Sequence, residues 1–249
     1  MSPLAALLLG SAGMSLIALV GGLTVLLPRR WLQALLLPLV ALAAGSLLGG
    51  ALFHMLPEGF AVLKPRQAGA WIAAGFTLFL ALEQLLHWHH SHHQGLRGAA
   101  PGAEPVAALI LLGDGLHNLT CGLGVASTYL IHPAAGVATW LAAAAHEIPQ
   151  ELGDFGVLVH SGWRPRQALL WNGVSALTFP LGALLAWGLR GSNLLAPLVL
   201  FAAGNFLYIA ASDLVPEIKA RLAPQEALLG FACFAAGLLL LAGLARDVG

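Results

Sequence analysis

Two apolar stretches of the sequence contain polar side chains that are able to bind a cation. One stretch carries the segment H-E-I-P-Q-E-L-G-D, from His146 to Asp154, and the other carries D-G-L-H-N-L-T-C, from Asp114 to Cys121. Ionisable side chains are costly in a hydrocarbon environment, so they are functional candidates wherever they occur there. Imidazole, carboxylate, amide and thiolate groups together form the ligand set of a borderline divalent ion such as zinc.

Helical geometry would place each polar set on one face of its helix. An α-helix turns about 100° per residue, so the polar residues of the later stretch span about 140° and those of the earlier stretch about 100°. The candidate metal ligands are Asp114, His117, Asn118, Cys121, His146, Glu147, Gln150, Glu151 and Asp154. A single buried His or Asn is more often hydrogen-bonded within the protein. This many polar groups, however, need water, a cavity or an ion to satisfy them, so the sequence predicts a metal site between the two helices.

The composition is typical of a protein embedded in a lipid bilayer. The 249 residues are 59% hydrophobic and 9% charged, whereas an ordinary soluble domain has roughly 25% charged residues. Runs near the roughly 20 residues that span a membrane lie at 4–27, 32–56, 70–88, 105–130, 134–160, 166–189, 194–215 and 225–245. We expect an all-α polytopic membrane protein, a single transmembrane domain over residues 1–249, with eight transmembrane helices and the metal site between helices four and five. A soluble helical bundle is disfavoured because residues 4–27 include no charge.

The basic residues of the connections predict an orientation. If the N-terminus lies outside, the inner segments carry Arg29, Arg30, Arg97, Arg164, Arg166, Lys219 and Arg221, and the outer segments carry Lys64, Arg66, Arg190 and Arg246. This excess of inner positive charge favours two extracytoplasmic termini. We expect a plasma or inner membrane as the location and the lipid bilayer as a partner, and the zero net charge gives no reason to expect nucleic acid.

A histidine-rich segment lies in the longest polar connection, a predicted cytoplasmic loop over about residues 87–104. Its histidines are His87, His89, His90, His92 and His93. Neutral imidazole binds zinc and similar ions, so the segment is a candidate for a weak metal reservoir. The alternative is a solvated linker, because Gly/Ala/Pro-rich tracts such as the one that follows are usually flexible.

The same motifs resemble the signature helices of the ZIP (Zrt-, Irt-like) divalent metal transporters. H-N-x-x-x-G in the fourth span and H-E-I-P-Q-E-L-G-D in the fifth are similar to the branch whose fifth helix reads H-E-x-P-H-E-x-G-D. Further matches lie at 54–58, 172–177 and 207–217, so the resemblance covers nearly the whole chain. It implies eight helices, a transport site with one or two metals on the fourth and fifth, movement between two helix bundles, and a homodimer.

The resemblance also implies roles for individual residues. It assigns His117, His146 and Gln150 to a first metal position, and Asn118 and Glu147 to a second. The family often has Asp or Glu in place of Cys121, and His or Glu in place of Gln150, at positions expected to bridge the metals. Because the thiol and the amide remove negative charge, we predict a weakened or single-metal site.

The expected function is transport of a divalent cation toward the cytoplasm, with zinc or another divalent transition metal as the transported substrate. The ligands of the site would replace the water that the ion loses, and release requires that binding not be too tight. His54, Glu58, Asp213 and Glu217 are candidates for the mouths of the pathway, although interfacial anchoring and helix capping explain them equally well.

Two other classes of function remain open from the sequence. The segment from His146 to Gln150 nearly reproduces the H-E-x-x-H motif of zinc proteases, which would suit an intramembrane zinc-dependent hydrolase. Against this, the second His is Gln150, and Pro149 disturbs the turn between them. A metal channel or metal sensor is the other alternative, and we expect that the protein is not an enzyme.

Overall fold

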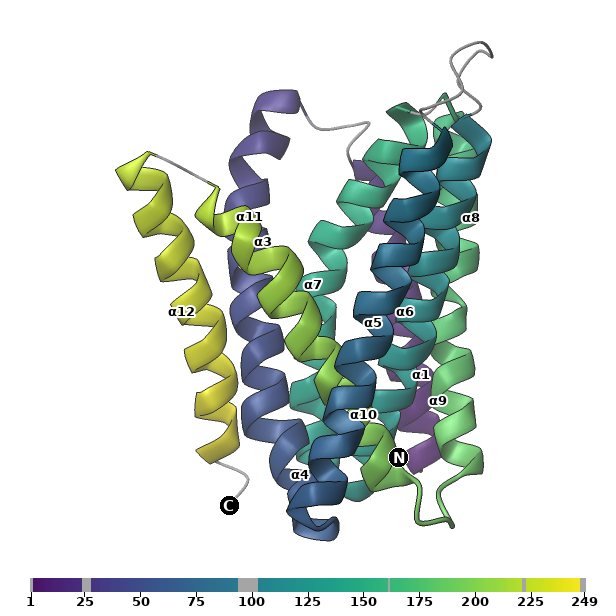
Figure 1. The fold of residues 1–249 in the computed structure, drawn as a ribbon, viewed down its shortest axis with the longest axis vertical. Helices are drawn as coiled ribbons and strands as arrows, with labels where there is room; N and C mark the ends of the chain where they lie inside the picture. The colour runs from purple at the N-terminus through teal and green to yellow at the C-terminus, as the bar shows by residue number, and fades with distance from the viewer. Residues whose placement is uncertain (1, 24–27, 94–102, 161, 221–222, 247–249) are drawn as a thin grey trace.

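The computed structural model describes residues 2–23, 28–93, 103–160, 162–220 and 223–246, and in these residues every regular element is helical. The all-α prediction is confirmed. The elements join end to end into rods (Figure 1): α1 (Pro3–Ile17) with the 3₁₀-helix η1 (Ala18–Gly22); α3 (Arg29–Gly50) with the π-helix η2 (Ala51–Met55) and α4 (Leu56–Val62); α5 (Pro65–His93); α6 (Ala103–Ile131); α7 (Pro133–His160); α8 (Pro165–Ala176) with α9 (Thr178–Gly188); α10 (Leu195–Tyr208) with the π-helix η3 (Ile209–Leu214) and α11 (Val215–Lys219); and α12 (Pro224–Arg246).

Six helical segments of the described residues are long and apolar enough to cross a membrane, so the chain is a multi-pass membrane protein. They are Pro3–Gly22, Ala34–Val62, Pro65–Leu85, Pro165–Gly188, Leu195–Lys219 and Pro224–Ala245. The described parts of α6 and α7 are not among these six segments. The count of eight spans therefore stays a prediction.

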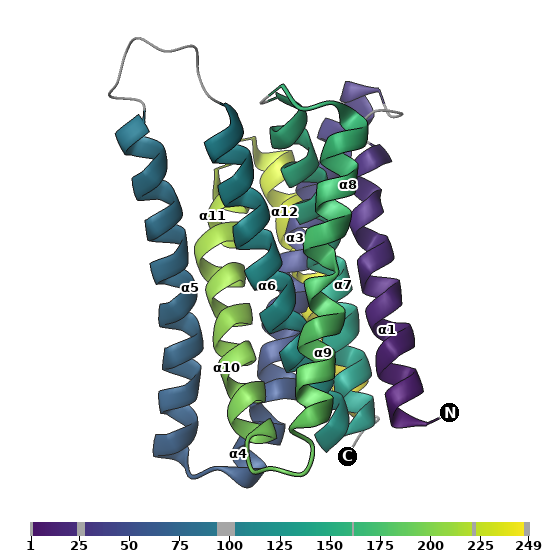
Figure 2. The same cartoon turned by 90° about the vertical axis from the view of Figure 1, so that its right-hand side faces the viewer.

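The ends of the described chain share one end of the bundle. In both views the start of α1 and the end of α12 lie at the end opposite to the end of α5 and the start of α6 (Figures 1 and 2). The expectation that both termini lie on one side of the membrane fits this arrangement. Which side they occupy stays a prediction.

Glycines allow the backbones of α6 and α9 to approach closely. A Cβ on Gly122 of α6 would collide with the carbonyl oxygen of Phe179, and a Cβ on Gly182 of α9 would collide with that of Leu119. Small residues serve this purpose in membrane helices, where packing rather than water exclusion drives association. The contact fixes α6, which carries four of the nine candidate ligands.

The sixth predicted span is two helices rather than one. Pro180 has no N–H group, so the carbonyl oxygen of Ala176 loses its helical partner four residues later. The hydroxyl of Ser15 on α1 donates to this oxygen at 3.1 Å. The chain therefore breaks at Leu177, between α8 and α9, and the hydrogen bond from Ser15 joins this break to α1.

Residues 87–93 of the predicted histidine-rich loop are helical, which differs from the prediction. α5 continues to His93, and α6 begins at Ala103. The extension has a local cause, because no Gly or Pro occurs between Gly75 and Gly95 to end the helix. The side chains of the five histidines and residues 94–102 lie outside the described residues, so the reservoir stays a prediction.

Candidate metal site

The helices α6 and α7 bring two imidazoles and a carboxylate together inside the bundle. The Nε2 atoms of His117 and His146 lie 2.8 Å apart, and the two rings are nearly perpendicular, at 86°. The Oε2 atom of Glu147 lies 3.8 Å from Nε2 of His117 and 3.7 Å from Nε2 of His146. All three side chains are buried. They form the first group, with ligand atoms within 4.8 Å of one another.

A second group, made only of carboxylates, shares Glu147 with the first. Its members are Asp114, Glu147 and Glu151, and again one oxygen of each lies within 4.8 Å of the others. Among the described residues, both oxygens of Glu147, Oδ2 of Asp114 and Oε1 of Glu151 have no hydrogen-bond partner. Buried carboxylates this close repel one another, and an uncompensated buried charge is costly. A bound cation would reduce the repulsion between the carboxylates and compensate their buried charge.

The neighbouring amides are oriented by hydrogen bonds to carboxylates of the second group. Oδ1 of Asp114 accepts from Nδ2 of Asn118 at 2.9 Å and from Nε2 of Gln150 at 3.0 Å. Asn118 therefore keeps its buried Oδ1 atom without a partner among the described residues. Nδ2 of Asn172, on α8, donates to Oε2 of Glu151 at 2.8 Å. The sequence indicates Asn172 only through a family match, although a polar residue in an apolar span is itself a signal.

Four of the nine predicted ligands lie outside both groups: the amides of Asn118 and Gln150, which donate to Asp114, and the side chains of Cys121 and Asp154. Cys121 is fully buried and belongs to the hydrophobic core, in the same cluster as Met55 and Phe179. Asp154 lies one turn beyond Glu151 on α7 and lines the cavity described next. The polar stripe of each helix is therefore longer than the group of ligands that the fold assembles.

A cavity of about 420 Å³ extends from the site between α5, α6, α7 and the α10–η3–α11 rod. Its polar and charged lining consists of Glu83, Asp114, His117, His146, Gln150, Asp154, Tyr208, Asp213 and Glu217. Those of α6 lie in its first half, those of α7 in its middle and second half, and Asp213 and Glu217 in η3 and α11. The start of α6, the end of α7 and α11 all lie at the end of the bundle opposite to the start of α1 and the end of α12 (Figure 1), so the cavity runs away from those two ends. Asp213 and Glu217, two of the predicted mouth residues, thus share a cavity with the metal site.

The other two predicted mouth residues do not line this cavity. Nε2 of His54 lies 2.8 Å from the carbonyl oxygen of Leu241 on α12. Oε1 of Glu58 lies 3.8 Å from Nδ1 of His132, at the junction of α6 and α7. His132 had not been singled out in the sequence, where it is a lone histidine before Pro133.

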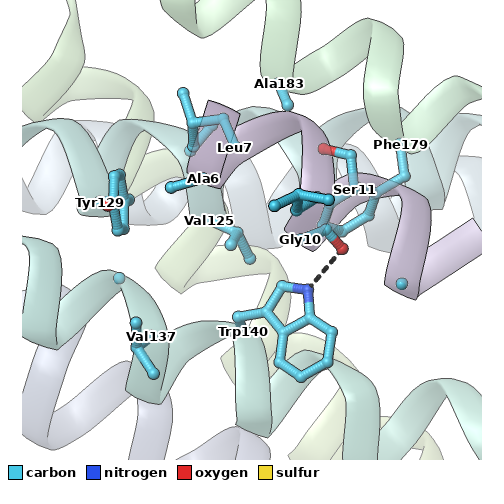
Figure 3. Close-up of a pocket in the computed structure, with 14 residues that line it drawn as sticks. Ala6, Leu7, Gly10, Ser11, Val125, Tyr129, Val137, Trp140, Phe179 and Ala183 are labelled. Atoms are coloured by element: carbon cyan, nitrogen blue, oxygen red, sulfur yellow. Dashed lines mark hydrogen bonds between the residues drawn. The ribbon is translucent and has the colours of Figure 1, made fainter. Parts of the chain in front are cut away.

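A separate apolar cavity of about 440 Å³ lies between α1, α6, α7 and α9 (Figure 3). Trp140 crosses it, and its Nε1–H donates to the carbonyl oxygen of Gly10 at 2.9 Å. No carboxylate or imidazole occurs among the described residues that line this cavity. The candidate metal ligands Asp114, His117 and His146 line the polar cavity instead.

Glu83 and Tyr208 are further polar residues that the sequence reasoning missed. Glu83 is the one charged residue of the run at 70–88, so the rule that drew attention to Glu147 applied to it as well. The hydroxyl of Tyr208 donates a hydrogen bond to the carboxylate of Glu83. The two residues lie 125 positions apart, and nothing in the sequence indicates that they pair.

Comparison with known proteins identifies the family of this chain. The family model described as ZIP Zinc transporter matches residues 89–245, which is more than half of the chain. The chain therefore belongs to the ZIP family, whose members are transporters rather than enzymes, and the family suggested by the motifs is confirmed.

Individual relatives extend the match beyond that region. Zinc transporter ZIP13 of Pongo abelii is 30% identical over 221 residues, covering 82% of this chain and 65% of the relative. Zinc transporter YKE4 of Saccharomyces cerevisiae is 30% identical over 224 residues, covering 78% and 64%. Human zinc transporter ZIP10 is 36% identical over 141 residues, covering 53% of this chain but 17% of the relative. The chain thus spans less than two thirds of the length of these three relatives.

Proposed function

We propose that this protein carries a divalent metal ion, zinc in the first place, across the membrane toward the cytoplasm through the site between α6 and α7. The observation that carries the proposal is the position of Glu147. Its carboxylate belongs to both ligand groups, is buried, and has no hydrogen-bond partner among the described residues.

The first group suits an ion that has lost its water. Zinc takes imidazole nitrogens at about 2.0–2.1 Å in tetrahedral geometry, which sets two ligating nitrogens roughly 3.3 Å apart. The Nε2 atoms of His117 and His146 lie closer, at 2.8 Å. An arriving ion would replace their hydrogen bond and move the rings apart by a small amount, while Glu147 supplies negative charge.

The second group offers the ion a next position. Because Glu147 belongs to both groups, an ion can exchange its imidazole ligands for Asp114 and Glu151 without losing this carboxylate. Oxygen ligands suit zinc less selectively than imidazole does, and such a weaker position favours release. The cavity that continues from Asp114 toward Asp213 and Glu217 supports an exit at that end.

The proposed direction rests on charge and topology together. The cavity runs toward the end of the bundle that carries the start of α6 and the end of α7, opposite to the start of α1 and the end of α12. The excess of Lys and Arg predicts that this end is cytoplasmic. A cytoplasmic exit and two extracytoplasmic termini follow from the same assignment.

The hydrolase alternative gains no support. The amide of Gln150, which occupies the position of the second histidine of H-E-x-x-H, is hydrogen-bonded to Asp114, and the family is one of transporters. The channel and sensor alternatives and the homodimer stay untested predictions.

Uptake of radioactive zinc into liposomes that contain the purified protein tests the proposal. We expect saturable uptake that His146→Ala abolishes and that unlabelled metals inhibit in the order of preference. His160→Ala, at the last residue of the same helix, is the matched control and should transport normally. Bound zinc without uptake by the unsubstituted protein would contradict a carrier.

A further inference from the structure

Tyr208 and Glu83 hold a fixed arrangement in the cavity that leads away from the metal site. The ring of Tyr208, at the end of α10, packs edge-on against Phe76 of α5, with ring centroids 5.1 Å apart at 89°. Its hydroxyl donates to Oε2 of Glu83, on the same helix as Phe76. The hydroxyl is therefore positioned by packing as well as by its hydrogen bond.

The same cavity joins this pair to the metal site. Asp114 and His117, also in its lining, are 5% and 4% exposed. Each keeps one buried polar atom, Oδ2 and Nδ1 respectively, without a partner among the described residues. Among the described residues that line the cavity, the charged side chains are the carboxylates of Glu83, Asp114, Asp154, Asp213 and Glu217.

We propose that Glu83 is a metal-contacting carboxylate on the exit path, and that the Tyr208 hydroxyl limits how tightly it holds the ion. This inference rests on the proposed function. A carboxylate oxygen that accepts a hydrogen bond has less electron density to offer a cation, and partners of this kind tune metal ligands. Glu83 would attract the ion out of the site, and the hydrogen bond from Tyr208 would keep Glu83 from binding the ion too tightly for release.

The two residues should then give different kinetic phenotypes. Glu83→Gln retains the shape and an oxygen that can accept from Tyr208, but it removes the charge. We expect maximal zinc uptake to fall roughly tenfold, while equilibrium zinc binding at the site stays unchanged. Tyr208→Phe leaves Glu83 a stronger ligand, so the half-saturating zinc concentration should fall together with the maximal rate.

The experiment measures initial rates of zinc uptake in proteoliposomes and equilibrium zinc binding for the same preparations. Glu226→Gln, an exposed carboxylate on α12 outside the cavity, is the charge control. Tyr129→Phe is the tyrosine control, because Tyr129 lines the apolar cavity of Figure 3 and is the other of the two tyrosines. Both controls should behave as the unsubstituted protein does.

Other outcomes overturn the inference. A Glu83→Gln variant that transports at the unsubstituted maximal rate shows that the ion does not depend on this carboxylate. Glu83→Asp keeps the charge at a shorter reach, and it should transport faster than Glu83→Gln; equal rates would reduce Glu83 to a structural partner of Tyr208. If Glu83→Gln does not fold, Glu83→Asp and Tyr208→Phe test the inference instead. Equal changes of the half-saturating zinc concentration and the maximal rate in these two variants would also reject the role of Glu83 as a metal ligand. Absence of uptake by the unsubstituted protein instead rejects the proposed function itself.

Discussion

At the scale of single residues, Glu147 is the side chain on which both ligand groups depend. Replacement by Gln removes the charge from both groups and keeps the volume. We expect zinc affinity to fall by more than roughly 100-fold, since even outer-shell changes cost about 10–100-fold. The metal-free protein should unfold at the same or a higher temperature, because a buried charge without a hydrogen-bond partner is removed.

Glu151→Gln is the matched comparison for this prediction. It alters the carboxylate group alone, and its new amide can still accept from Asn172 through its oxygen. Its loss of affinity should therefore be smaller. Calorimetric titration with zinc and thermal unfolding with and without zinc measure both effects, since a ligand that binds the folded state raises its stability. Equal losses of zinc affinity in the two variants would contradict the inference that Glu147 serves both ligand groups.

Gln150 gives a second prediction at this scale. Its amide is neutral and donates to Asp114, so the site has less negative charge than the family pattern implies. We expect one zinc ion per chain, measured by elemental analysis of the purified protein at saturating zinc. Gln150→His, which restores a family residue and adds a strong zinc ligand, should tighten binding by roughly tenfold. Two ions per chain, retained in Asn118→Ala, would count against the single-metal site.

The sequence predicts which residues belong to this site better than it predicts which of them contact one another. The type and spacing of His117, His146 and Glu147 show that they share helix faces, and the costs of burial indicate a cation. The exclusion of Cys121 and the sharing of Glu147 depend on the rotation of α6 against α7. The pairing of Glu83 with Tyr208 depends on α5 lying beside α10, and no local pattern encodes such contacts.

At the scale of elements, the approach of α6 to α9 gives a stability prediction. Gly182→Ala places a methyl group against the backbone of α6 at Leu119, so the helices must separate. Overpacking of this kind costs about 1–3 kcal/mol. Gly188→Ala lies on the same helix with no neighbouring atom within 4 Å, and it should be neutral or stabilising, because Ala favours helix over Gly. Thermal unfolding of both variants in detergent decides, and similar melting temperatures would contradict the close contact.

The predicted spans correspond well to the rods, but the interruptions within them do not follow from hydropathy. The π-helices η2 and η3 each end just before an x-Pro-Glu segment, at Pro57 and Pro216. A proline indicates that one helical hydrogen bond is missing. It does not indicate whether the backbone widens into a π-turn, as in these two rods, breaks as at Leu177, or continues as at Pro149 in α7. At the break near Leu177 a neighbouring helix supplies a substitute donor, since Ser15 of α1 donates to the carbonyl oxygen of Ala176.

At the scale of the whole molecule, the orientation of the protein in the membrane can be predicted only from structure and sequence together. The ribbon places both ends of the described chain at one end of the bundle (Figure 2), and the distribution of Lys and Arg predicts that this end is extracytoplasmic. Ser192, between α9 and α10, lies on the same end, whereas Gln167 lies in the first turn of α8 at the opposite end; both are exposed. An engineered cysteine at each position therefore reports on one side of the membrane.

We expect a membrane-impermeant maleimide to label Ser192→Cys in intact cells and Gln167→Cys only after permeabilisation. The unsubstituted chain sets the background, since Cys121 is buried and Cys233 is partly buried within α12. The reverse pattern would invert the topology, and the cavity that leads from Asp114 to Glu217 would then be an entry path rather than an exit. Because Glu83 and Tyr208 lie in that cavity, the labelling result also decides whether their effect on zinc belongs to capture or to release.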